Sequence, residues 1–246
     1  RHGGRALVFV HGYNTGFDFA VYRAAQIAYD LRFDGVPFVY SWPSGGDFTS
    51  YTYDRESSEQ AEPYLRAFLE LVISKTGATS VSIIAHSMGN KPLLHALAEI
   101  KRSVPAAVKL NQIILAAPDI DRDGFENIVT QIKGLGRGIT LYASSNDRAM
   151  AASRRFHGGV ARAGDVPRGG PIVIAGIDTI DVTATSTDIV ALNHSGYAEN
   201  SAILKDIELL LRTGLRPPEQ RMPTIAKIGT PTGDFWRYPA VRTGAP

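Results

Sequence analysis

Short apolar runs alternate with amphipathic segments along most of the chain. The runs are rich in β-branched residues, which is typical of buried parallel strands. The segments between them carry apolar residues at helical spacing and are long enough for crossover helices. This alternation predicts an α/β fold with a doubly wound, mostly parallel sheet. Strands are expected at 5–10, 37–42, 80–85, 108–117, 139–144 and within 172–185.

Helices are expected in the intervening segments. The first runs from Asp18, as its N-cap, to about Arg32, and the second covers 54–76, where Pro63 either opens or kinks the helix. A third follows Ser87 to about Arg102, and others are expected at 148–156 and 201–212. The predicted core stripe of the first helix consists of Val21, Ala24, Ala25, Ala28 and Leu31.

The composition changes near the C-terminus, where residues 214–246 become rich in proline. Proline-rich segments form neither long helices nor central strands. We therefore expect one α/β domain over 1–213, followed by a tail over 214–246 that is either extended or packed on the domain.

The stretch Ser80–Asn90, with the sequence SVSIIAHSMGN, combines a strand, a tight turn and a helix start, with Ser87 at the turn. Ala85 and Gly89 lie two residues to either side of this serine. Small residues are needed where the backbone passes closely through a sharp turn. Such a turn would present the Ser87 hydroxyl at the end of a strand and the N–H of Met88 at a helix start. Alternatively, Ser87 is only a helix N-cap.

Other polar residues follow the remaining predicted strands. They are His11 to Asn14 after the first strand, then Asp119, Asp147 and His194. Because functional groups gather at the carboxyl ends of parallel strands, we expect these residues near Ser87. A serine, a histidine base and an orienting acid are the groups that acyl transfer needs.

Within this set, His194 is the predicted base, since it follows the last strand and histidine titrates near neutral pH. The N–H groups of Tyr13 and Met88 are the predicted donors to the oxyanion. His11 is expected to support the Tyr13 loop through hydrogen bonds. The acid is either Asp147 or Asp119, and Asp119 could instead cap a helix.

The segment Leu7–Asn14 (LVFVHGYN), the turn Ala85–Gly89 and the Ser-Asp-His order resemble the α/β-hydrolase superfamily. More narrowly, they resemble the bacterial esterase/lipase-like branch known as DUF900. The resemblance runs from about Arg5 to about Arg212, with Ala85 where many members have glycine. It implies the α/β-hydrolase fold, beginning at the family's third strand, and Asp147 as the triad acid.

Larger lids in this fold enter after the strand that ends near Asp119. Only 121–138 is available there, so little or no cap domain is expected. The loops at the same edge carry Phe17, Trp42 and Phe48, which are predicted to line an apolar pocket, as Tyr51 also could. Several of these aromatic side chains could instead pack the helix at 54–76 against the sheet.

The predicted function is a serine hydrolase that cleaves carboxylic esters through an acyl-enzyme. Its expected substrate is a small-molecule ester with an apolar acyl or alcohol part. A thioesterase, an amidase or an acyltransferase would use the same triad. An alternative of another class is a non-catalytic binding module with the same fold.

Composition narrows the remaining possibilities. The 246 residues are 44% hydrophobic and 20% charged, as in an ordinary soluble domain, and no apolar run is long enough to span a membrane. The net charge of +2 and scattered basic residues predict no nucleic-acid partner. The chain lacks cysteine and histidine pairs with ligand spacing, so neither a metal nor a cofactor is expected. It opens on Arg1 without Met, which suits a cytoplasmic domain or an exported one whose targeting segment was removed.

Overall fold

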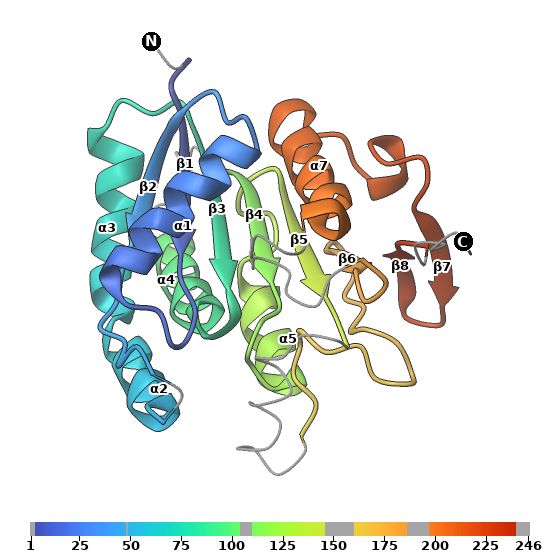
Figure 1. Ribbon diagram of the computed structural model, residues 1–246, viewed down its shortest axis with the longest axis horizontal. Helices are drawn as coiled ribbons and strands as arrows, with labels where there is room; N and C mark the ends of the chain where they lie inside the picture. Colours follow the sequence, from blue (N-terminus) through green and yellow to red (C-terminus); the bar gives the residue numbers. More distant parts are fainter. Residues whose placement is uncertain (1–2, 48, 104–109, 146–159, 186–196, 240–246) are drawn as a thin grey trace.

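The computed structural model describes residues 3–47, 49–103, 110–145, 160–185 and 197–239, and of 197–201 only the backbone. Within this part of the chain, one eight-stranded sheet forms the centre of the molecule (Figure 1). The only antiparallel neighbours in it are the last two strands. Across the sheet the strands are β2 (Val36–Tyr40), β1 (Arg5–Val10), β3 (Ser80–His86), β4 (Leu110–Ala116), β5 (Gly138–Ala143), β6 (Asp178–Asp181), β8 (Gly233–Arg237) and β7 (Ala226–Thr230).

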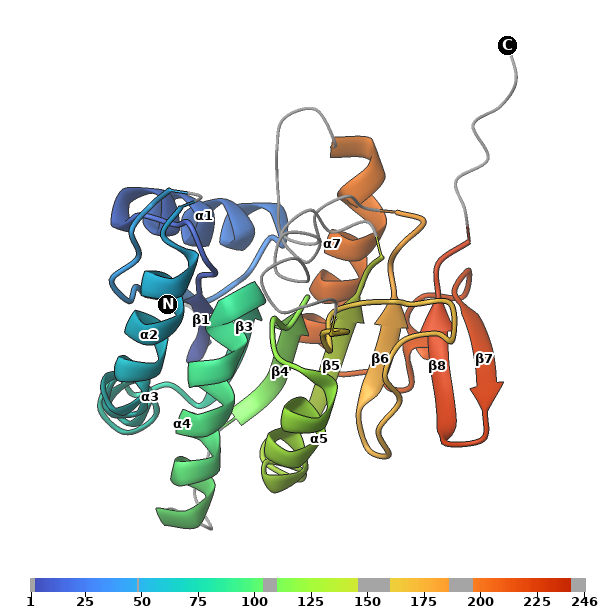
Figure 2. The ribbon, with the colours of Figure 1, turned by 90° about the horizontal axis from the view of Figure 1, so that it is seen from below.

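Helices cover both faces of this sheet, as Figure 2 shows. On one face lie α1 (Phe17–Asp30) and α7 (Tyr197–Thr213), whose buried residues pack with Leu7, Ile84 and Tyr142. The other face carries α2 (Tyr51–Gln60), α3 (Glu62–Lys75), α4 (Asn90–Ser103) and α5 (Arg122–Gln131). Two short 3₁₀ turns are η1 (Ser87–Gly89) and η2 (Pro218–Gln220). The predicted doubly wound, mostly parallel α/β fold is confirmed.

The first helix differs in detail from the prediction. Its N-cap is Gly16 rather than Asp18, which lies in the first turn without a capping hydrogen bond. The buried side chains are Ala20, Ala24, Ile27 and Leu31, whereas Val21 and Ala25 are exposed. Ala24 and Leu31 of the predicted stripe are confirmed, but apolar residues occur on more than one side of this helix, so spacing alone also selected Val21 and Ala25.

The single helix predicted over 54–76 is two helices that meet at Ala61. Pro63 has no N–H to continue the hydrogen bonding of α2, so it lies in the first turn of α3, where that loss is tolerated. Of the two roles predicted for Pro63, it opens the helix. The break separates α3 from α2, which carries the buried Tyr51 and Asp54.

The described segment between β4 and β5 forms no cap domain. Residues 117–137, all described, contain only α5, whose N-cap Asp121 accepts a 2.7 Å hydrogen bond from the N–H of Gly124. Later in the chain, residues 162–165 cross the ends of β4 and β5. The N–H of Gly164 donates to Pro118, and its carbonyl accepts from Ser144. This crossing segment brings Arg162 next to Asp119.

The C-terminal segment contains a β-hairpin that sequence analysis did not predict. β8 pairs in parallel with β6 and antiparallel with β7, so the hairpin extends the sheet. Phe235, Trp236 and Tyr238 are buried against the domain, which explains their place among the prolines. The helix predicted at 148–156 lies outside the described residues.

Candidate active site

Ser87 stands at a strained turn between β3 and α4. Its φ of 49° lies in the left-handed region, which costs a residue with a side chain about 1–2 kcal/mol. It follows the last residue of β3 and begins η1, so the N–H groups of this turn have no preceding helical turn to bond. This is the strand, tight turn and helix start that the sequence predicts.

Gly89 and Gly12 bring the loop after β1 against this turn. A Cβ on Gly89 would collide with the carbonyl oxygen of His11. A Cβ on Gly12 would lie only 3.0 Å from the Cβ of Ser87. The sequence analysis expected a small residue at position 89 because the strand and helix backbones pass closely through the turn. In the structure, the backbone that comes close to Gly89 is that of His11, in the loop after β1.

Two hydrogen bonds hold the carbonyl oxygen of Ser87, in addition to the one from the backbone N–H of Asn90. It accepts one from the side-chain amide of Asn90, at 2.9 Å, and one from the N–H of Asp119, at 3.3 Å. Asn90 is fully buried and also donates to the carbonyl of Ala116 at the end of β4, at 3.2 Å. These bonds tie the serine turn to the adjacent strand. Sequence analysis missed Asn90, although it directly follows the small-residue motif.

His11 supports the loop after β1, as predicted. Its Nε2 accepts from the N–H of Trp42 at 3.2 Å, so the proton is on Nδ1, which donates to the carbonyl of Gly12 at 2.8 Å. The imidazole ring of His11 stacks on the indole ring of Trp42, with ring centroids 4.7 Å apart. Burial lowers the pKa of His11, more than its hydrogen bonds with Gly12 and Trp42 raise it. His11 is therefore a neutral structural group rather than a catalytic base.

Asp119 lies beside the serine turn with both carboxylate oxygens engaged. Oδ2 accepts from the Tyr51 hydroxyl at 2.8 Å, and Oδ1 pairs with Arg162 Nε at 2.8 Å. Arg162 also donates to the Asp119 carbonyl, at 2.9 Å. The helix cap in this segment is Asp121, so the helix-cap interpretation of Asp119 is wrong.

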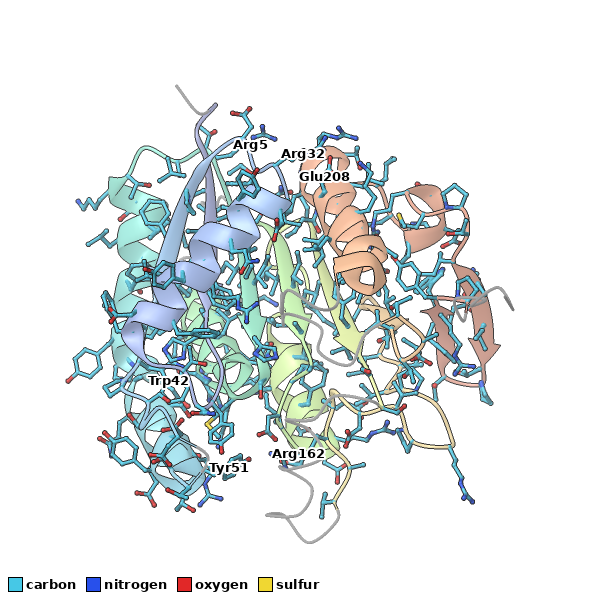
Figure 3. The ribbon with its side chains drawn as sticks, in the orientation of Figure 1. Arg5, Arg32, Trp42, Tyr51, Arg162 and Glu208 are labelled. Atoms are coloured by element: carbon cyan, nitrogen blue, oxygen red, sulfur yellow. The ribbon has the colours of Figure 1, made fainter. Side chains whose placement is uncertain are left out.

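A cleft of about 280 Å³ opens next to these residues. Figure 3 shows Tyr51 and Arg162 at the same edge of the molecule, with Trp42 nearby. Most side chains that line the cleft are polar or charged. The lining residues are Tyr51, Arg55, Ser58, Glu59, Met88, Lys91, Asp119, Ile120, Asp121 and Arg162.

The aromatic residues predicted to form a pocket are placed differently. Trp42 is 2% exposed, stacks on His11 and donates its indole N–H to the His11 carbonyl, so it belongs to the core. Phe17 is 65% exposed at the start of α1. Of the predicted aromatic residues, Tyr51 lines the cleft, and the ring of Tyr13 packs edge-on against it at 5.3 Å. Phe48 lies outside the described residues.

The predicted acid Asp147 and base His194 also lie outside the described residues, beyond the ends of β5 and β6 along the chain. The structure thus brings together Ser87, Met88 and the Tyr13 loop, with Asp119 beside them. Among the described residues, no group of three or more metal-ligating side chains occurs. None of the helices in the same residues is long and apolar enough to cross a membrane.

Several solved structures are similar to this chain, and that of ESTFA has a TM-score above 0.5. The crystal structure of ESTFA has 10% sequence identity and a TM-score of 0.52, over 87% of this chain and 78% of that one. An esterase of Pyrococcus furiosus, Pf2001, has 12% identity and a TM-score of 0.49, over 85% and 81%. A predicted CIB-like hydrolase of Thermoplasma acidophilum has 17% identity and a TM-score of 0.45, over 85% and 87%.

Sequence comparison gives the family. An uncharacterized protein of Nostoc sp., alr1448, is 31% identical over 80 residues, which are 32% of this chain and 21% of that protein. The match therefore spans about a fifth of that relative. Residues 1–212 match the family model described as "Alpha/beta hydrolase of unknown function (DUF900)". The chain belongs to this family of alpha/beta hydrolases.

Proposed function

We propose that this protein is a serine hydrolase that cleaves carboxylic esters through an acyl-enzyme. The observation that carries the proposal is the backbone of Ser87, a non-glycine residue with φ 49° between a central strand and a helix. Such a strained residue persists only where the surrounding structure holds it, and this combination is typical of a nucleophile.

The proposed reaction begins when Ser87 Oγ attacks the ester carbonyl carbon and His194 takes its proton. The N–H groups of Tyr13 and Met88 stabilise the tetrahedral oxyanion. Its collapse breaks the bond to the alcohol oxygen, and His194 returns the proton to the departing alcohol. Water, activated by His194, then attacks the acyl-enzyme and releases the acid and the free serine.

Gly12 and Met88 support the proposed oxyanion site. A Cβ on Gly12 would lie only 3.0 Å from the Cβ of Ser87, so the loop that carries Tyr13 runs beside Ser87. Met88 follows the serine in η1 and lines the cleft. Donors of this kind each contribute about 3 kcal/mol to transition-state stability in other hydrolases.

We propose Asp147, rather than Asp119, as the acid that orients His194. Both oxygens of Asp119 already bind described partners, Tyr51 and Arg162. Recruiting this carboxylate for a histidine would weaken a buried ion pair, which is costly. Asp147 follows β5, at the position implied by the resemblance to the α/β-hydrolases.

The polar cleft alters the expected substrate. Because Arg55, Glu59, Lys91 and Arg162 are among its lining residues, the cleft suits an ester with a short or polar acyl part. This replaces the apolar acyl or alcohol part that the predicted aromatic pocket favoured. We propose an ester as the substrate because ester cleavage is a hydrolase reaction, which is consistent with this family of alpha/beta hydrolases.

A fluorophosphonate probe tests the nucleophile, because it phosphonylates an activated serine. We expect labelling of the wild type, none of Ser87→Ala and a strong loss in His194→Ala. Ser58→Ala is the matched control, since Ser58 is a buried serine lining the same cleft. Absence of labelling in pure, folded wild-type protein would refute the proposal.

A further inference from the structure

The carboxylate of Asp54 is fully buried close to the proposed oxyanion loop. It comes from α2 and accepts three hydrogen bonds. Oδ2 accepts from the N–H of Asn14 at 2.9 Å and from the Ser44 hydroxyl at 2.7 Å. Oδ1 accepts from the N–H of Gly45 at 2.7 Å. One side chain thus joins α2 to the loops that follow β1 and β2.

Ser44 extends this network to further backbone groups. While its hydroxyl donates to Asp54, its oxygen accepts from the N–H of Thr15 at 3.1 Å and of Gly46 at 3.3 Å. Residues 14–15 are therefore bound to residues 44–46 through two side chains. Asn14 has a φ of 54°, a left-handed conformation that asparagine tolerates better than most residues.

Tyr13 lies between two fixed points of this loop. On one side, Gly12 touches the Ser87 turn, and its carbonyl accepts from His11. On the other side, Asn14 is bound to Asp54. The Tyr13 carbonyl is also held, by the Thr15 hydroxyl at 3.1 Å. These contacts leave the peptide that carries the Tyr13 N–H little freedom to rotate.

We propose that Asp54 is a positioning residue that orients the Tyr13 N–H toward the oxyanion formed at Ser87. This role rests on the proposed function, and Asp54 itself touches no reacting atom. Oxyanion donors are effective because they are oriented before the charge develops. Three donors converge on this carboxylate, so an acceptor on both oxygens is required. An asparagine of the same shape would turn one acceptor into an N–H group that faces another donor.

Asp54→Asn tests the role with little change of volume. We expect kcat for p-nitrophenyl acetate to fall about tenfold to a hundredfold, with KM changed less than twofold, because the lost interaction acts mainly in the transition state. Ser44→Ala should act in the same direction by about threefold, since it removes one of three donors and leaves both backbone bonds to Asp54.

Asp206→Asn is the matched control. Asp206 is an equally buried carboxylate, bound to Tyr142 and Arg221 on the opposite face of the sheet. Its substitution should lower the melting temperature without changing kcat at a temperature where the variant is folded. The comparison thereby separates the effect of losing any buried carboxylate from the specific effect of releasing the loop that carries Tyr13.

Hydrogen exchange provides a readout that needs no activity. Amide exchange at residues 12–15 should accelerate in Asp54→Asn and stay unchanged in Asp206→Asn. Unchanged kcat, or a lower kcat without faster exchange in this loop, would overturn the positioning role. An inactive wild type would instead refute the proposed function, and the exchange result would still decide whether Asp54 holds the loop.

Discussion

The side-chain amide of Asn90 donates a 2.9 Å hydrogen bond to the carbonyl oxygen of Ser87. A second bond from the same nitrogen reaches Ala116, so one buried group fixes the serine turn against β4. The Asn90 Oδ1 has no hydrogen-bond partner among the described residues. The amide therefore acts through its Nδ2 donor, whereas its buried Oδ1 acceptor forms no hydrogen bond with the described residues.

Replacing Asn90 by alanine should impair both stability and catalysis. Two buried carbonyl groups would each lose one hydrogen bond, and one such bond contributes about 0.5–1.5 kcal/mol. We expect the free energy of unfolding to fall by about 2 kcal/mol and kcat to fall about tenfold, because the left-handed Ser87 backbone loses a restraint. Urea unfolding and p-nitrophenyl acetate turnover measure these changes. Asn127→Ala, exposed on α5, is the control, and equal behaviour of the two variants would contradict this role.

Gly89→Ala should be more damaging than its size suggests. The added methyl group would meet the His11 carbonyl, a backbone atom that the bonds around His11 and Trp42 hold in place. Overpacking of this kind costs about 1–3 kcal/mol. Differential scanning calorimetry should show a melting temperature lower by several degrees. Gly16→Ala is the control, since Gly16 has an ordinary φ of –69° and open space around its Cβ position.

The sequence pattern was sufficient for strands β1 to β6 and for the serine turn. The β-branched runs and the small residues at 85 and 89 depend on local sterics, which a sequence displays directly. The same pattern did not predict the buried, hydrogen-bonded positions of Asn90, Asp54 and Arg162. Their partners lie on other elements, so no local pattern marks them as buried and bonded.

The aromatic residues illustrate the same limit. An indole in a loop is equally compatible with a pocket wall and with the core, and stacking on His11 decides for the core at Trp42. The hairpin β7–β8 was missed because prolines near it suggested an extended tail. Its strands depend on pairing with β6, a long-range contact.

Asp147→Asn and Asp119→Asn should have opposite profiles. Loss of the acid that orients a catalytic histidine lowers kcat on the order of 10⁴-fold in serine hydrolases. Asp147→Asn should show such a loss with little change in stability. Asp119→Asn should instead reduce the free energy of unfolding by about 3 kcal/mol, since Arg162 would lose its charged partner in a buried site. A larger kcat loss for Asp119→Asn would reverse the proposed assignment.

His11 should make the fold less stable in mild acid. Burial lowers its pKa in the folded protein below the value of 6.5 expected in the unfolded chain. Below pH 6.5 the unfolded state therefore binds more protons than the folded state, and stability falls until the folded pKa is reached. The difference in unfolding free energy between wild type and His11→Asn should thus shrink from pH 7 to pH 5.

The comparison with a His11 variant is needed because other groups titrate nearby in pH. Burial raises the pKa of Glu62 to about 7, which acts in the opposite direction, and His95 has a lowered pKa. Urea unfolding of wild type, His11→Asn and His95→Asn at both pH values separates the contributions of the two histidines, since Glu62 is present in all three proteins. A wild-type advantage over His11→Asn that is independent of pH would show that His11 does not titrate on unfolding.

Acyl-chain preference distinguishes the polar cleft from an apolar pocket. Burying one CH₂ group contributes about 0.8 kcal/mol, so an apolar pocket would raise kcat/KM about fourfold for each added carbon. The lining of Arg55, Lys91 and Arg162 provides no such gain. We expect kcat/KM for p-nitrophenyl esters to be highest for acyl groups of about two to four carbons, because a small polar pocket favours short acyl groups. The value should then decline toward octanoate. A steady rise through octanoate would mean that residues outside the described part of the chain supply an apolar wall, and it would restore the apolar substrate that the sequence first predicted.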